Sequence, residues 1–546
     1  MNTRSAAGIE CVRNYHQRTK HHLDRYADGP GFLDWDQQPD PFRRFEGSPL
    51  YPLPLTIDQL PDPALGELER QPPYKLLHSW GLTEISSLLR HNLGLSAWKV
   101  YGPDRWALRC NPSSGNLHPT EGYLIVRGLP MLKSGVYHYA PHEHALELRA
   151  AFKTDSESLN TATAEILLGL SSIPWREAWK YGERALRYVH LDLGHAIGAS
   201  DYAAATLGFR FEPLETNSKM LATLMGLDRD QDFIHAESER PDLLLRLTSD
   251  NTADSPTPLT GWLAQAEGAD WYGQANRLSQ HPRHQWPIID EVCDAIARNE
   301  GEPEKGHGDD DFPPMTTTAD TSARQLILKR RSAQAFYDNR SLPKQDFVHL
   351  LDSLLPRQDD VPWRAWPYRA QIHLVLFVHH VDEITSGLYL LLRRSDVLEP
   401  LKREMNKSFS FEKPEGIPQH LSLYRLITAD SQQAARVISC HQDIAADSFF
   451  SLGMLAAFDH TLETQGAIGY PRLYWEAGLI GQALYIHAES LGVRGTGIGC
   501  FFDDLVHELL GLSTTRFQSL YHFTVGEPKD DTRLQTLPPY SHLSRS

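Results

Sequence analysis

Two stretches of the chain, RYVHLDLGHAIGASDYAAATLGF (187–209) and RLYWEAGLIGQALYIHAESLGV (472–493), resemble each other and indicate an internal duplication. Their shared glycines align at one constant shift, because 478 − 194 and 492 − 208 both equal 284. Each copy also has an acidic residue two positions before the first of these glycines, Asp192 or Glu476. The abundant alanine and leucine and the final Leu-Gly predict one long, buried helix in each half of the chain.

Other paired segments follow in the same order. SGVYHY (134–139) resembles SGLYLL (386–391). After each long helix, a short helical segment ends in Gly-Leu (226–227 and 511–512), and an apolar strand follows (242–249 and 519–526). We therefore expect an α+β protein made of two α/β/α sandwich halves that pack as a pseudo-dimer within one chain. The expected organisation is an N-terminal extension (1–74), a first half (75–250), a linker region (251–320), a second half (321–530) and a C-terminal tail (531–546).

Composition excludes several classes of protein. With 546 residues, of which 41% are hydrophobic, the chain can bury a large core, so wholesale disorder is excluded. A net charge of −17 argues against a dominant nucleic-acid surface. The five cysteines are scattered without a CxxC motif, and the histidine clusters lack metal-ligand spacing, so we expect neither a disulfide framework nor a metal site. No apolar signal or membrane-length segment occurs, and the expected location is the cytoplasm.

Three short segments could bind an anion. KRRSAQAF (329–336) places two adjacent guanidinium groups beside a hydroxyl, although a solvated basic turn explains it equally well. NPSSGN (111–116) predicts a tight turn with exposed backbone donors, or else an ordinary loop. GTGIG (495–499) has alternating glycines that could wrap a phosphate, although it is not a dinucleotide fingerprint. The candidate residues in them are Arg330, Arg331, Ser332, Gln334, Pro112, Ser113, Ser114, Gly115, Asn116, Gly497 and Gly499.

The order of these segments resembles the FMN-dependent nitroreductase superfamily: Arg-Arg-Ser after a helix, Pro-Ser-x-x-Asn before a strand, Glu-Ala-Gly in a long helix, then a glycine-rich turn. More narrowly, the chain looks like the SagB-type branch, the azoline dehydrogenase group. That resemblance is carried by YHQRTKH (15–21) and by WKYGERALRY (179–188), which contains Lys180 and Tyr181.

The resemblance implies a tandem nitroreductase-like fold in which FMN lies between the halves and takes residues from both. The second half alone keeps Arg-Arg-Ser and the glycine-rich turn, whereas the first half alone keeps the Pro-Ser-Ser-Gly-Asn turn. The remaining segments are complementary and would form one complete site, so we expect one FMN per chain. Arg330 and Arg331 would then bind the phosphate, with Ser332 and Gln334 near the phosphate, ribityl chain or ring edge. Residues 112–116 would line the flavin ring.

Lys180 and Tyr181 are the expected catalytic residues, on the resemblance alone. A lysine in a partly desolvated pocket can act as a base, and a neighbouring tyrosine hydroxyl can donate or relay a proton. The alternative is a surface lysine beside a packing tyrosine.

The resemblance leaves three functional hypotheses open. The first is a SagB-type dehydrogenase that transfers hydride between a small-molecule or peptide heterocycle and flavin N5 and works with a biosynthetic partner enzyme. The second is an NAD(P)H-dependent reductase of nitro compounds or quinones. The third is a non-catalytic flavin- or peptide-binding module. None involves nucleic acid or a membrane, and whether chains associate beyond the intrachain pseudo-dimer is left open.

Overall fold

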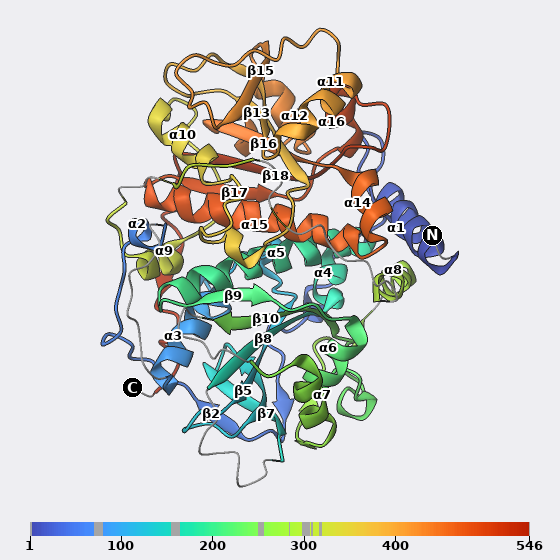
Figure 1. Ribbon diagram of the computed structural model, residues 1–546, viewed down its shortest axis with the longest axis vertical. Helices are drawn as coiled ribbons and strands as arrows, with labels where there is room; N and C mark the ends of the chain where they lie inside the picture. Colours follow the sequence, from blue (N-terminus) through green and yellow to red (C-terminus); the bar gives the residue numbers. More distant parts are fainter. Residues whose placement is uncertain are drawn as a thin grey trace.

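Both duplicated stretches are long buried helices in the computed structural model of the protein: α5 (Ala185–Ala205) and α15 (Gly469–Ser490). They pack against each other across the middle of the molecule, between a lower half and an upper half (Figure 1). The structure describes residues 3–69, 80–153, 164–248, 256–282, 284–297, 306, 310–315 and 319–544.

The two central helices cross at a pair of glycines. A Cβ atom added to Gly194 would lie 2.2 Å from the carbonyl oxygen of Trp475. One added to Gly478 would lie 2.2 Å from the carbonyl oxygen of Leu191. Both contacts are with rigid backbone, so each helix needs glycine at the crossing point. These are the glycines that align at the shift of 284 residues.

Each half contains a sheet, and the two sheets share one strand order. The first runs β11-β7-β6-β5-β8-β10-β9 and the second runs β15-β14-β13-β16-β18-β17, so the second repeats the order of the first from β7 to β9. All these neighbours are antiparallel. The strands of the first sheet are β5 (Thr120–Arg127), β6 (Gly135–Ala140), β7 (Ala145–Ala151), β8 (Glu165–Ser172), β9 (Arg210–Pro213), β10 (Arg240–Thr248) and β11 (Asp270–Trp271), with β2 (Leu50–Pro52) paired to β7. Those of the second are β13 (Ile372–Val378), β14 (Gly387–Leu392), β15 (Ser422–Thr428), β16 (Phe450–Ala456), β17 (Arg494–Ile498) and β18 (Gln518–Gly526).

Helices cover both faces of each sheet, which produces the expected sandwich. In the first half, α6 (Ser218–Met225) and α7 (Leu259–Glu267) bury their apolar side chains on the face turned away from α5. In the second half, α11 (Leu398–Glu404), α12 (Gln432–Ile438) and α16 (Asp503–Leu510) do the same on the face turned away from α15. The predicted Gly-Leu ends are correct, since α6 and α16 end at glycines with left-handed backbone, Gly226 and Gly511.

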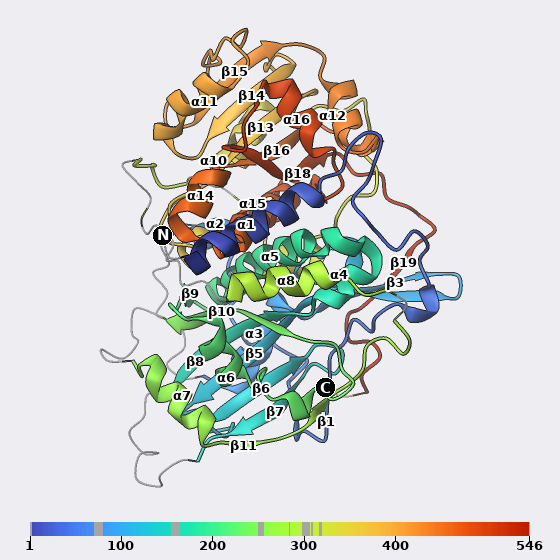
Figure 2. The ribbon, with the colours of Figure 1, turned by 90° about the vertical axis from the view of Figure 1, so that its right-hand side faces the viewer.

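The remaining helices are α1 (Thr3–Arg18), α2 (Leu65–Glu69), α3 (Leu82–Asn92), α4 (Pro174–Tyr181), α8 (Pro287–Ala297), α9 (Ala323–Lys329), α10 (Lys344–Asp352), α13 (Asp443–Ala446) and α14 (Phe458–Gln465). Figure 2 shows α1 beside α15 and α8 beside α5, and α1 and α8 also contact each other. A further sheet joins β3 (Leu95–Tyr101), β4 (Asp104–Arg109) and β19 (Gln535–Leu537), while β1 (Phe45–Glu46) pairs with β12 (Gln274–Ala275).

Two boundaries differ from expectation. Residues 251–320 were predicted as a linker, yet this region supplies α7, α8, β11 and β12. The Gly/Pro-rich part of that linker lies largely outside the described residues (298–305, 307–309 and 316–318). The C-terminal tail contributes β19, which pairs with β3 of the first half. None of the described helices is both long enough and apolar enough to cross a membrane.

Candidate active site

A cavity of about 690 Å³ lies between the two halves, and we call it the shared cavity. The first half contributes Lys99, Trp106, Leu108, Arg109, Asn111, Pro112, Ser113, Asn116 and His118. The second half and the tail contribute Leu328, Lys329, Arg330, Arg331, Ser332, Ala333, Gln334, Arg494, Lys529, Asp530, Asp531, Thr532, Leu534 and Thr536. Predicted binding residues from the two halves, more than 200 positions apart in sequence, thus line one space.

The turn on the first-half side is held from below by Asp192 of α5. Its carboxylate accepts hydrogen bonds from the Ser114 backbone N–H (3.0 Å) and the Ser114 hydroxyl (2.9 Å). Gly115, Asn116 and His118 all have positive φ, an arrangement that bends the chain sharply before β5. The resulting turn aims Pro112, Ser113 and Asn116 at the shared cavity.

Arg330 and Arg331 enter the cavity where α9 ends. The Arg330 guanidinium is buried over the ring of Tyr485 and donates from Nε to the Cys110 carbonyl (3.2 Å) and from Nη2 to the Arg109 carbonyl (3.3 Å). Its Nη1 is buried and has no hydrogen-bond partner within the described part of the chain. Arg331 donates mainly to backbone carbonyls, including Leu328 (2.8 Å). An oriented guanidinium with one free NH₂ group is suited to receive an anion.

The charges of the residues that line the shared cavity also favour an anionic ligand. The lining contains seven basic residues (Lys99, Arg109, Lys329, Arg330, Arg331, Arg494 and Lys529) against Asp530 and Asp531, in a protein of net charge −17. Burial and the charge of Arg330 lower the pKa of Arg331 to about 10. Crowded cations at one site stabilise an anion there, so the residues present fit a phosphate-bearing ligand.

Lys180 and Tyr181 lie behind the turn, at the C-terminal end of α4. A Cβ atom added to Gly115 would lie 2.7 Å from the Tyr181 hydroxyl and 3.1 Å from Lys180 Nζ. The Tyr181 ring packs on Tyr188 of α5, with centroids 4.2 Å apart. Burial, followed by the charge of Glu177, raises the pKa of Tyr181 well above its ordinary value, so this hydroxyl keeps its proton.

Sequence reasoning did not identify two carboxyl groups in this region as members of the site. Glu177 lies one turn before Lys180 on α4 and is fully buried, and neither of its carboxyl oxygens has a hydrogen-bond partner among the residues that the structure describes. Burial and the neighbouring Asp192 raise its pKa well above the ordinary value. Burial raises the pKa of Asp192 to about 7, against the hydrogen bonds from Ser113 and Ser114. Two signals in the sequence could have indicated them: the i, i+3 spacing of Glu177 and Lys180, and the acid at position 192 that aligns with Glu476.

Comparison with known proteins places the second half in a family. Residues 327–527 match the sequence model of the nitroreductase family. They form a nitroreductase-family domain. A protein of Methanocaldococcus jannaschii named as a nitroreductase is 31% identical over 135 residues, which is 22% of this chain and 66% of that protein.

Solved structures extend the nitroreductase likeness to nearly the whole chain. A crystal structure from Anabaena variabilis, described as a nitroreductase, is 20% identical, covers 95% of this chain and 99% of its own, and has a TM-score of 0.64. This similarity shows the fold: a tandem nitroreductase-like arrangement. A chain of the Escherichia coli microcin synthetase McbBCD complex is 15% identical and covers 58% of this chain and 96% of its own, but its TM-score of 0.29 is too low to support an argument.

Four residues predicted to bind the cofactor, all within the described chain, stand outside the lining of the shared cavity: Ser114, Gly115, Gly497 and Gly499. Residues 494–498, expected as a turn, form the edge strand β17 of the nitroreductase domain. A Cβ atom on Gly497 would meet the Tyr521 hydroxyl at 1.7 Å, and one on Gly499 would meet the Tyr188 ring at 2.2 Å. Close packing against aromatic rings therefore accounts for both glycines.

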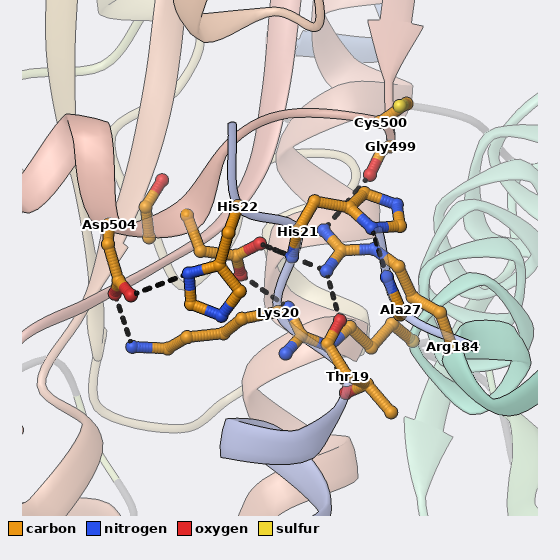
Figure 3. A network of polar contacts seen from close by, with 12 residues as sticks. Thr19, Lys20, His21, His22, Ala27, Arg184, Gly499, Cys500 and Asp504 are labelled. Atoms are coloured by element: carbon orange, nitrogen blue, oxygen red, sulfur yellow. Dashed lines mark hydrogen bonds and ion pairs between the residues drawn. The ribbon is translucent and has the colours of Figure 1, made fainter. Parts of the chain in front are cut away.

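The YHQRTKH segment (15–21) joins the first half to the nitroreductase domain. The Tyr15 hydroxyl donates to the Glu183 carbonyl (2.7 Å), directly after Lys180 and Tyr181. Lys20 pairs with Asp504 at 2.8 Å (Figure 3). Asp503 pairs with Arg184 (3.0 Å) and Arg187 (2.6 Å), both fully buried, and its pKa is driven far below the ordinary value by them. The segment thus orients the end of α4 without entering the shared cavity.

Proposed function

We propose that the chain is an FMN-dependent oxidoreductase of the SagB type, binding one FMN in the shared cavity and oxidising a small-molecule or peptide heterocycle. One observation carries the proposal: the cavity joins the 112–118 turn of one half to residues 328–334 of the other, with the free Nη1 of Arg330 buried at their junction. The nitroreductase family is typically flavin-dependent, which favours FMN as the anion.

In this proposal Arg330 and Arg331 hold the phosphate, and Ser332 and Gln334 lie along the chain between phosphate and ring. Pro112, Ser113 and Asn116 face the ring, and the Ser332 hydroxyl is already oriented by the Tyr485 hydroxyl at 2.7 Å. The flavin, when bound, supplies a hydride acceptor. The protein supplies the rest of the chemistry through groups that bind the substrate and move its proton.

Lys180 and Tyr181 are the proton-transfer pair in this scheme. Oxidation of an azoline to an azole turns the single bond between two neighbouring ring carbons into a double bond. One carbon loses a hydride and its neighbour loses a proton, so a base must take the proton. Lys180 Nζ is the base and the Tyr181 hydroxyl orients the substrate heteroatom. The buried carboxyls of Glu177 and Asp192 lie near the pair, and Asp192 holds the turn that faces the substrate.

A reductase of nitro compounds or quinones is the second candidate, favoured by the names of the Methanocaldococcus and Anabaena proteins. It needs the same FMN site but no base on the protein. The third candidate, a non-catalytic binding module, predicts bound FMN that no substrate reduces.

The first test is cofactor content. The purified protein should carry a flavin absorption spectrum and release FMN, identified by chromatography, at about one per chain. A chain that binds no FMN at micromolar concentration would remove the proposal. Two FMN per chain would contradict the single shared site.

The second test separates the candidates. Lys180→Ala should lower thiazoline or oxazoline oxidation by about 10²- to 10⁴-fold, the usual contribution of a general base, while FMN content stays unchanged. Tyr181→Phe tests the hydroxyl alone, because the ring that packs on Tyr188 is kept. Undiminished turnover of NADH with a nitroaromatic in Lys180→Ala, without any azoline oxidation by the native protein, would favour the reductase.

A further inference from the structure

Two cysteines from distant parts of the second half meet at its surface, away from the shared cavity. Cys440 follows α12 and Cys500 follows β17, and their Sγ atoms are 2.8 Å apart. Both are unbonded thiols, and both are partly exposed. A disulfide bond is about 2.05 Å long, so little motion separates these thiols from a bonded pair.

Backbone contacts on either side hold the thiols together. The N–H of Phe502 donates to the carbonyl of Ile438 (2.8 Å), and the side-chain amide of Gln442 donates to the carbonyl of Cys500 (3.2 Å). Cys440 and His441 adopt φ values of +53° and +60°, the left-handed region that side-chain-bearing residues seldom occupy. Two consecutive residues in this conformation persist only where their surroundings over-determine it, and such sites concentrate at functional positions.

A histidine from the N-terminal segment is oriented toward Cys500. His21 Nδ1 accepts a hydrogen bond from the Ala27 N–H at 3.0 Å, so the neutral ring carries its proton on Nε2 (Figure 3). The hydrogen bonds from Cys440 and then from His21, with the charge of Arg184, lower the pKa of Cys500 below its ordinary value. The same Cys440–Cys500 contact, with burial, raises the pKa of Cys440. Cys500 is the thiol that lies beside the His21 ring and the positive charge of Arg184, so we assign it as the attacking thiolate and Cys440 as the thiol that follows.

We propose that Cys440 and Cys500 form a redox-active dithiol, which low-molecular-weight disulfides oxidise to an intramolecular disulfide. The Cys500 thiolate attacks one sulfur of the oxidant R–S–S–R, forming a mixed disulfide and releasing one thiolate RS⁻. Cys440 then attacks the Cys500 sulfur, its proton leaves with the departing thiol, and the Cys440–Cys500 bond forms. In sum, the dithiol loses two electrons and two protons, and the oxidant becomes two molecules of RSH.

The site is connected to the candidate active site through the neighbouring backbone. The Gly499 carbonyl, next to Cys500, accepts hydrogen bonds from Tyr188 Oη and Arg184 Nη2 (both 3.2 Å). Tyr188 packs on Tyr181, and β17, which leads into Cys500, begins at Arg494 of the shared cavity. The dithiol chemistry itself does not depend on which ligand occupies that cavity.

The test treats the purified, cofactor-loaded protein with oxidised glutathione and maps its disulfides by mass spectrometry of peptides. We expect a peptide cross-linked between Cys440 and Cys500, formed at least tenfold faster than glutathione adds to Cys11, a partly exposed cysteine outside the pair. Separate glutathione adducts on Cys440 and Cys500 without the cross-link would overturn the proposal, and this measurement needs no variant.

Variants then assign the roles. In Cys440→Ser the mixed disulfide should accumulate on Cys500, because the resolving thiol is gone. In Cys500→Ser the remaining Cys440 should react at least tenfold more slowly than Cys500 does, and His21→Gln should slow the first attack several-fold. Faster reaction of Cys440 than of Cys500 would contradict the assignment. Circular dichroism confirms that each variant is folded.

Discussion

Asp192 and Glu476 occupy the same position of the two central helices, 284 residues apart, yet their surroundings differ. Each accepts hydrogen bonds from the backbone that leads into the first paired strand of its half: Ser114 for Asp192, and Gln371 with Ile372 for Glu476. Glu476 also pairs with the buried guanidinium of Arg393. Among the described residues no cation pairs with the carboxyl of Asp192, and burial raises its pKa to about 7.

The difference between these acids follows the difference between the two sides of the molecule. Beside Asp192 the chain bends into the open turn of the shared cavity. At the corresponding place of the second half, η5 (Trp363–Ala365) and Trp366 are packed into the core, and Arg364 pairs with Asp201 at 2.9 Å. The side with the Asp192 turn thus keeps an open cavity whose lining has an excess of basic side chains, as the binding of an anion requires. The corresponding place of the second half is filled by packed side chains. The duplicated fold is therefore compatible with a single binding site.

Replacing either glycine of the helix crossing should lower the stability of the protein by a similar amount, and this is the largest effect that we predict. Gly194→Val and Gly478→Val each drive a side chain into rigid backbone 2.2 Å away, and each should destabilise the protein by more than about 4 kcal/mol. Urea denaturation and soluble yield measure this. Gly268→Ala is the control, because its nearest neighbour is at 3.6 Å. A large difference in stability between the two valine variants would show that the two sides of the crossing are not equivalent.

Neutralising the acid of the filled side should destabilise strongly. Glu476→Gln leaves the Arg393 guanidinium, which is 1% exposed, without its counter-charge, and removing one partner of a buried pair costs about 3–5 kcal/mol. Adding Arg393→Met to this variant should recover part of the stability in the same denaturation experiment. A loss below about 1 kcal/mol in the single variant would mean that the ion pair is not what distinguishes Glu476.

Neutralising Asp192, the acid of the open side, should stabilise the protein instead of destabilising it. The carboxyl of Asp192 keeps its proton up to about pH 7 in the native protein, whereas the unfolded chain releases it near pH 3.8. The unfolded state therefore binds fewer protons between these values, and native stability falls as pH rises through that window. Asp192→Asn keeps an acceptor for Ser114 but cannot ionise. It should match the native protein at pH 4 and exceed its stability by up to about 4 kcal/mol at pH 8.

Thermal midpoints measured from pH 4 to pH 8 test this prediction. The advantage of Asp192→Asn over the native protein should grow with pH and level off above pH 7. An advantage that is independent of pH, or a loss of stability at pH 8, would contradict it.

Removing one cation from the open side should affect ligand binding more than stability. Arg330→Ala should weaken FMN binding by about 30- to 150-fold, the value of about 2–3 kcal/mol for a hydrogen bond to a charged group. Arg364→Ala, which removes a guanidinium group from the filled side, should leave FMN affinity unchanged. Flavin fluorescence titration measures both, and equal losses in the two variants would contradict a single site.

The sequence was sufficient to predict the two long helices, their terminal glycines and the recurrence of paired segments in the same order along the chain. Those features depend on periodicity and on local backbone requirements, which a sequence carries directly. The Arg-Arg-Ser and Pro-Ser-Ser-Gly-Asn segments were likewise visible as candidates for anion binding. The folded α7 and α8 were missed, because their apolar faces lie beside a Gly/Pro-rich stretch that indicated a linker over the whole region.

Only the tertiary structure decided which residues share a space. It joins residues 112–118 to 328–334 in one cavity, and it makes Gly497 and Gly499 packing positions for Tyr521 and Tyr188. It also buries Glu177 beside Lys180 and brings Cys440 to Cys500. The physical reason is that burial, charge crowding and contact depend on distances across the fold, whereas the sequence alone determines what each segment can become locally.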